Sequence, residues 1–148
     1  MSLSIIHLDS LTISGSQSKL SDPVSNELSI ISAEKSRAFA NFKQPAGGQQ
    51  LFAVNHNDAG DSLYILGTAT STSNIRFELP EGDYAEFDLN ISNREEADQQ
   101  IGAMYGEIGM SKEYAIGDSF SLEQLGADGT VQKLFVPVIK AKRMKTHL

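Results

Sequence analysis

Helix and turn signals recur in this chain at an interval of 70 positions. Asp22 stands before a proline, and a capping residue followed by proline is a typical helix start. Ser92 lies 70 positions further on, three residues before Glu95, in the pattern of a capping box. Asp58 and Asp128 belong to two turns that are also 70 positions apart. This repeated order of signals constrains the chain to a fold made of two similar halves.

Short apolar runs surround the two predicted helices and are bounded by turn residues, as is typical of strands. We expect strands at residues 50–56, 63–69, 75–79, 84–89, 119–125 and 131–139. Each half then runs strand, helix, strand, turn, strand. The sequence predicts an α+β fold in which two βαββ halves, related by a pseudo-twofold axis, form an antiparallel sheet. Both helices would cover one face of this sheet, and a central ligand cleft would lie between the halves.

Three local patterns carry further structural predictions. The polar segment 15–18 is expected to be a turn. Gly102 and Gly106 share one face of the second predicted helix, where each costs about 1 kcal/mol relative to alanine. We therefore expect this helix to pack closely on the sheet. Pro137 falls in the last apolar run and predicts an edge or a bulge, because proline has no amide hydrogen to donate.

The length of 148 residues suits one domain over 1–148. Its halves would be about 1–72 and 73–141, followed by a basic tail at 142–148. The net charge is -7 at pH 7, and an acidic domain repels phosphate backbones, so direct nucleic-acid binding is not expected. The excess of acidic groups favours cationic ligands or partners instead.

Other sequence features limit where in the cell the protein is expected and which cofactors it could use. No apolar run approaches the roughly 20 residues of a membrane-spanning helix, and the N-terminus lacks the pattern of a signal peptide. The absence of cysteine fits a reducing compartment, so we expect a cytoplasmic protein without a membrane partner. The histidines lack metal-ligand spacing, and no glycine-rich phosphate loop follows a strand. We therefore expect neither a metal nor a cofactor.

The second half contains motifs that resemble a known family. Residues 77–87 read Phe-Glu-Leu-Pro-Glu-Gly-Asp-Tyr-Ala-Glu-Phe. This is similar to the hydrophobic-Pro-small-Gly-x-Tyr-Ala-x-Phe stretch of gyrase-inhibitor-like domains, which also serve as effector-binding domains of some AraC-type and MerR-type bacterial regulators. Residues 122–125 resemble the family's Glu-x-Tyr strand, and residues 134–138 resemble its closing hydrophobic-Pro-Val strand. Tyr114 lies where the family has an aromatic residue after its second helix. The specific matches are confined to about 77–140.

The resemblance implies a central pocket in which Glu123 meets the positive charge of a lipophilic cationic ligand. It also implies functions that range from multidrug sensing to toxin protection and gyrase inhibition, and some members are hydrolases of strained, DNA-alkylating compounds. Two features depart from the family. Leu125 replaces the tyrosine of the Glu-x-Tyr strand, and the chain has no tryptophan.

The candidate ligand-binding residues are Glu123, Tyr84, Tyr114, Glu86 and Tyr105. A carboxylate in an apolar pocket with aromatic walls attracts cations through charge and cation–π contacts. Glu86 has the strand parity of Tyr84, so it is either a second acidic group of the site or an exposed carboxylate. The two other tyrosines flank the end of the second helix, where they would line the site or belong to the core. Phe120 differs in parity from Glu123 and is expected to pack beneath the helices.

Three functions remain open from the sequence. The first is a stand-alone effector-binding domain that captures an amphipathic cationic small molecule, by sequestration or sensing and without a DNA-binding module. The second is a hydrolase in which Glu123 would be a general acid or base, provided that burial raised its pKa. Leu125 counts against this second function. The third is a protein-interaction module, such as a gyrase modulator.

Overall fold

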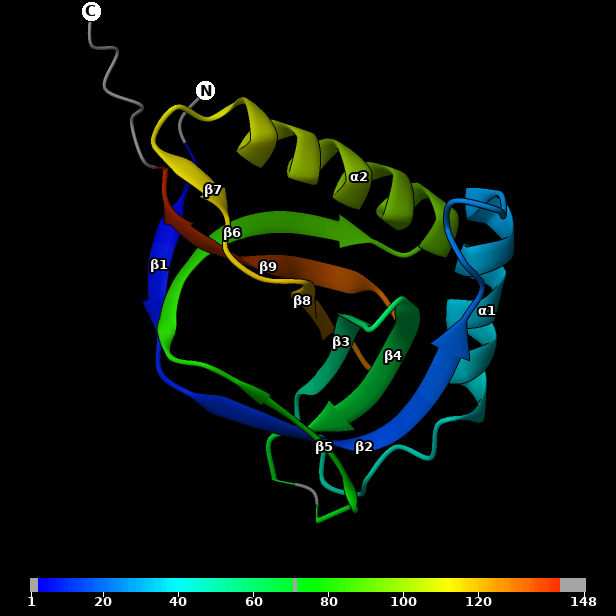
Figure 1. The fold of residues 1–148 in the computed structure, drawn as a ribbon. Coiled ribbons are helices and arrows are strands. Elements are labelled where there is room, and N and C mark those ends of the chain that lie inside the picture. Colours follow the sequence, from blue (N-terminus) through cyan, green and yellow to red (C-terminus); the bar gives the residue numbers. More distant parts are fainter. Residues whose placement is uncertain (1–2, 71, 142–148) are drawn as a thin grey trace, which may run out of the picture.

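A computed structural model describes residues 3–70 and 72–141 (Figure 1). The predicted basic tail at 142–148 lies outside the described residues. The elements in chain order are β1 (Ile5–Leu8), β2 (Leu11–Leu20), α1 (Leu28–Asn41), β3 (Leu51–Asp58), β4 (Asp61–Thr68), β5 (Ile75–Leu79), β6 (Gly82–Ile91), α2 (Arg94–Met110), β7 (Tyr114–Ile116), β8 (Phe120–Leu125) and β9 (Val131–Lys140).

The strands form a nine-stranded antiparallel sheet, which confirms the α+β fold. Its order is β1-β6-β9-β8-β3-β4-β2-β5, and β7 pairs with β9. The halves are β2-α1-β3-β4 and β6-α2-β8-β9, and they meet where β3 pairs with β8. Outward from this junction the order is β3-β4-β2 on one side and β8-β9-β6 on the other. Equivalent strands thus occupy equivalent positions, as the predicted pseudo-twofold requires.

The sheet curves round on itself, and at each end a strand from one half pairs with a strand of the other half (Figure 1). β1 pairs with β6, where Ile5 is opposite Ala85, and β5 pairs with β2, where Leu79 is opposite Leu11. The helices cover one face of the curved sheet. α1 contacts β2 and β4, α2 contacts β6, β7 and β9, and the two helices contact each other.

The curvature gives the protein a second core inside the sheet, away from the helices. Phe120 belongs to this inner core, and its ring centroid lies 5.1 Å from that of Phe77 and 6.3 Å from that of Tyr84. The prediction that Phe120 packs beneath the helices is therefore wrong. Phe120 does point to the opposite face from Glu123, but that face is buried as well, because the curved sheet encloses it.

The helix starts differ slightly from the predicted ones. The Asp22 carboxylate accepts a hydrogen bond from the Val24 amide at 3.0 Å and closes a separate turn, so α1 begins only at Leu28. The cap of α2 is Asn93, whose side chain accepts from the Glu96 amide at 2.9 Å. The predicted cap, Ser92, thus lies one residue before the observed cap.

Two other local predictions are wrong. Segment 15–18 lies within β2 rather than in a turn, because pairing with β4 along the whole segment, and with β5 at Gly15, holds it extended. There Gly15 faces Gly67 so closely that a Cβ would lie 1.8 Å from the Leu66 carbonyl oxygen. Gly102 and Gly106 are exposed, and a Cβ at either position would meet nothing within 4 Å. They therefore do not bring α2 closer to the sheet.

Two features of the remaining chain complete the fold. Pro137 lies on β9 between the part that pairs with β8 and the part that pairs with the short strand β7, which the sequence did not predict. Neither helix of the described residues combines the length and the apolar character that crossing a membrane would need.

Candidate functional site

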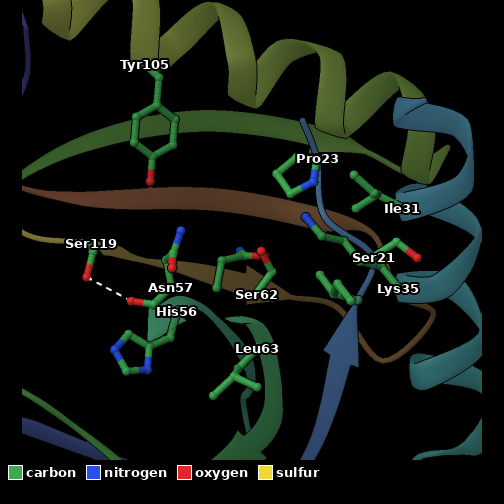
Figure 2. A pocket seen from close by; sticks show the side chains of 12 residues that line it. Ser21, Pro23, Ile31, Lys35, His56, Asn57, Ser62, Leu63, Tyr105 and Ser119 are labelled. Atoms are coloured by element: carbon green, nitrogen blue, oxygen red, sulfur yellow. Dashed lines mark hydrogen bonds between the residues drawn. The ribbon is translucent and has the colours of Figure 1, made fainter. Parts of the chain in front are cut away.

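A cavity of about 220 Å³ lies between the two helices, the end of β2 and the β3–β4 hairpin (Figure 2). The turn before α1 and the helix itself contribute Pro23 and Ile31, and the strands contribute Leu20 and Leu63. Tyr105 extends from α2 with its hydroxyl towards the cavity (Figure 2). Both halves thus form one concave site, which we call the interhelical cleft. Small-molecule sites commonly have this setting.

Polar groups line the rest of the interhelical cleft. Asn55 and Asn57 come from β3, Ser62 from β4 and Ser119 from the start of the β8 region. The Ser119 hydroxyl donates to the Asn57 carbonyl at 3.2 Å (Figure 2). Lys35 of α1 adds an ammonium group to the wall. The cleft therefore offers amide, hydroxyl and ammonium groups beside an apolar wall.

Glu123 lies behind Asn55 and has no exposed surface. Its Oε1 accepts a hydrogen bond from Nη1 of Arg94 at 2.8 Å, and its Oε2 accepts from Nη2 at 3.0 Å. Asn55 Nδ2 also donates to Oε2, at 2.8 Å. Such a two-point contact between arginine and carboxylate is among the strongest polar contacts in proteins.

Asp98 completes a buried set of four charged side chains, Lys35, Arg94, Asp98 and Glu123, which we call the charge cluster. Asp98 Oδ1 lies 2.6 Å from Nη2 of Arg94 and 3.0 Å from Nζ of Lys35. The same ammonium lies 3.6 Å from Oε2 of Glu123. Two cations thus balance two anions. Within the described residues, every buried side-chain nitrogen and oxygen has a hydrogen-bond partner.

The charge cluster sets the pKa of Glu123. Burial alone would raise the pKa of the Glu123 carboxyl, but Arg94 and Lys35 outweigh burial and, with hydrogen bonds from Arg94 and Asn55, lower this pKa to about 2. Burial raises the pKa of the Tyr64 phenol well above its ordinary value. The phenol therefore keeps its proton and donates to Oε1 of Glu123 at 3.1 Å.

Tyr84 and Glu86 lie on the opposite face of the sheet from Glu123. Tyr84 is buried in the inner core, and its hydroxyl donates to the Pro80 carbonyl at 2.7 Å. Glu86 forms an ion pair with Lys133 at 3.2 Å. The structure therefore does not bring these two predicted residues together with Glu123.

The other two tyrosines are both half-buried, but only one lines the interhelical cleft. Burial raises the pKa of the Tyr105 phenol, which faces the cleft. Tyr114 lies on β7 opposite Lys140 and packs with the apolar core under α2, which includes Val138. Glu123, Asn55 and Tyr105 thus lie on one side of the sheet, and Tyr114 lies further along the same layer.

Sequence reasoning missed the three other members of the charge cluster around Glu123. Arg94 and Asp98 stand four positions apart on a helix, a spacing at which opposite charges meet, so this pair was detectable. Lys35 carried no such local signal, because its partners lie 63 and 88 positions further along the chain.

One group of side chains has the composition of a metal site. One ligand atom each of His7, Asp9 and Glu81 lies within 4.8 Å of the others, and all three residues are exposed. His7 Nε2 lies 2.9 Å from Glu81, and Nδ1 lies 3.2 Å from Asp83. Both ring nitrogens thus already have acidic partners, which suits a surface ion pair, and this raises the pKa of His7.

No protein-family model and no curated protein matches the sequence. Solved structures do match its fold. SAV2435, solved bound to tetraphenylphosphonium, has a TM-score of 0.68 at 13% identity, covering 94% of each chain. A Staphylococcus aureus MU50 protein, described as a candidate for bacterial transcription regulation, has a TM-score of 0.66 at 12% identity, covering 93% of this chain and 98% of that one. An integron cassette protein of Vibrio cholerae has a TM-score of 0.65 at 12% identity, covering 93% and 95%. These likenesses confirm the predicted α+β fold.

Proposed function

We propose that this protein binds an amphipathic small molecule in the interhelical cleft and acts by sequestration or sensing. The observation that carries the proposal is the cleft itself, a concave site where both halves meet and where an apolar wall faces amide and hydroxyl groups. A ligand with ring and polar parts would bury its apolar surface at about 25 cal/mol per Å² and bond to Asn55, Asn57 or Tyr105.

The fold comparison supports a small-molecule ligand. SAV2435, which shares the fold, was solved with tetraphenylphosphonium, a lipophilic cation. The cation contact that the family resemblance implies for Glu123 stays a hypothesis for this chain. Such a contact would require a ligand to replace Arg94, which already binds both carboxylate oxygens.

The hydrolase hypothesis finds no support in the charge cluster. A general acid at neutral pH needs a raised pKa and access to the substrate. Glu123 has a lowered pKa and no exposed surface. A protein-interaction role stays a prediction, to be tested by capture from lysate at low and at high salt.

The cleft proposal is tested by calorimetric titration with triphenylphosphine oxide, a polar molecule with three aromatic rings. Ser62→Trp would fill the cleft, whereas Ser29→Trp, exposed on α1, is the matched control. We expect binding to the native protein and to the Ser29 variant, and at least about tenfold weaker binding to the Ser62 variant. Equal affinity in all three proteins would contradict the proposal.

A further inference from the structure

We infer that Arg94 is a built-in counter-ion of Glu123 and that it sets the charge preference of the interhelical cleft, so that the cleft selects uncharged amphipathic ligands over lipophilic cations. This inference rests on the proposed function, because it names the ligand class of the same cleft.

The carboxylate of Glu123 already accepts as many hydrogen bonds as it can. A carboxylate has about four lone-pair directions. Arg94 takes one on each oxygen, Asn55 takes one on Oε2 and Tyr64 takes one on Oε1. Lys35 adds its charge at 3.6 Å. A ligand cation would find no free acceptor on this carboxylate.

The charge cluster is also neutral as a whole, with two cations and two anions. A cation that displaced Arg94 from Glu123 would leave the guanidinium with Asp98 alone, in a site where the Arg94 side chain is only 11% exposed. The site would then hold three cations against two anions. Breaking a buried ion pair is unfavourable because the separated charges have lost their hydration.

The wall of the cleft is unfavourable to a cation. Lys35 brings a positive charge to this wall, and no carboxylate is among the described residues that line it. A cation in the cleft would thus meet an ammonium group and no acidic partner. An uncharged acceptor, such as a carbonyl or phosphoryl oxygen, would meet the donors of Asn57 and Tyr105.

The test compares two ligands of matched shape, methyltriphenylphosphonium, which is a cation, and triphenylphosphine oxide, which is uncharged. Both have three phenyl rings on a four-coordinate phosphorus. Calorimetric titrations are run on the native protein and on Arg94→Met, which leaves the cluster with a net charge of -1. Arg94→Lys is the matched control because it keeps the charge, and Arg94→Met/Glu123→Gln restores neutrality.

We expect the native protein to bind the oxide more tightly than the phosphonium. In Arg94→Met the affinity for the phosphonium should rise at least about tenfold, with little change for the oxide, because Lys35 alone leaves one of the two negative charges of the cluster uncompensated. The gain should be absent in Arg94→Lys and in the double variant. Circular dichroism checks that each variant is folded.

A second variant keeps the inference testable if Arg94→Met does not fold. Lys35→Met also gives the cluster a charge of -1 while keeping the pair of Arg94 and Glu123, and the same gain is expected. The inference is overturned if the native protein binds the phosphonium as tightly as the oxide or more tightly, or if a folded variant whose cluster carries a charge of -1 gains no affinity for the phosphonium. If neither compound binds the native protein or any variant, the proposed function fails, and this outcome differs from binding of the oxide without a charge switch.

Discussion

Replacing Glu123 by glutamine should weaken the fold substantially although it changes few atoms. The variant removes the negative charge that faces Arg94 and Lys35. Glu123 has no exposed surface, so water cannot compensate for this loss. Removing one partner of a buried ion pair typically costs 3–5 kcal/mol. Arg94 keeps Asp98 as a partner, so we expect the lower end, roughly 3 kcal/mol.

The pKa of Glu123 leads to a similar magnitude. Folding lowers it from an ordinary 4.5 to about 2, and this difference corresponds to roughly 3 kcal/mol of stabilisation at neutral pH. Because the pKa of the folded state is the lower one, the stabilisation is present above about pH 4.5. It is lost as the pH falls towards 2, where the carboxyl becomes protonated.

The assay is urea unfolding followed by circular dichroism at pH 7 and at pH 2.5. For a slope of about 2 kcal/mol per M, Glu123→Gln should lower the midpoint at pH 7 by about 1.5 M. At pH 2.5 the gap between the native protein and the variant should shrink. Glu78→Gln, exposed on β5, is the control and should change the midpoint little at either pH.

Two results would refute this reasoning. A loss below about 0.5 kcal/mol at pH 7 would mean that the buried ion pair contributes nothing net to stability. A gap between native protein and variant that is equally wide at both pH values would mean that Glu123 does not titrate where the charge cluster places it.

Five further substitutions test the local structure by thermal unfolding. Gly102→Ala and Gly106→Ala should each stabilise the protein by about 0.5–1 kcal/mol, because both positions are exposed and have room for a Cβ; destabilisation would reveal a packing role. Asn93→Ala should cost about 1 kcal/mol and Ser92→Ala much less, and the reverse order would place the cap at Ser92. Gly15→Ala should cost at least about 3 kcal/mol, since its Cβ would overlap a carbonyl of the neighbouring strand; a neutral effect would contradict the strand register.

Much of the fold was predictable because its signals are local. Alternating apolar residues bounded by turns indicated β3, β4, β5, β6, β8 and β9 close to their observed limits. The prediction failed for β2, whose polar segment 15–18 is held extended by pairing with the distant strand β4 and, at Gly15, also with β5. No local pattern contains this information.

The site was less predictable because its decisive contacts are distant in sequence. Parity on β8 separated Glu123 from Phe120, but the sequence could not show that Lys35 and Arg94 already pair with this carboxylate. Likewise, the strand β6 was predicted, yet the face of Tyr84 became known only from the strand register.

The most direct test of the central claim is an NMR titration of the native protein with triphenylphosphine oxide, followed through the side-chain amides. We predict shifts for Asn55 and Asn57, which line the interhelical cleft, and none for Gln49 and Gln50, which line a separate cavity beside the end of β8. Shifts confined to the two glutamines, or none at any of the four amides at saturating ligand, would contradict the claim that the cleft is the binding site.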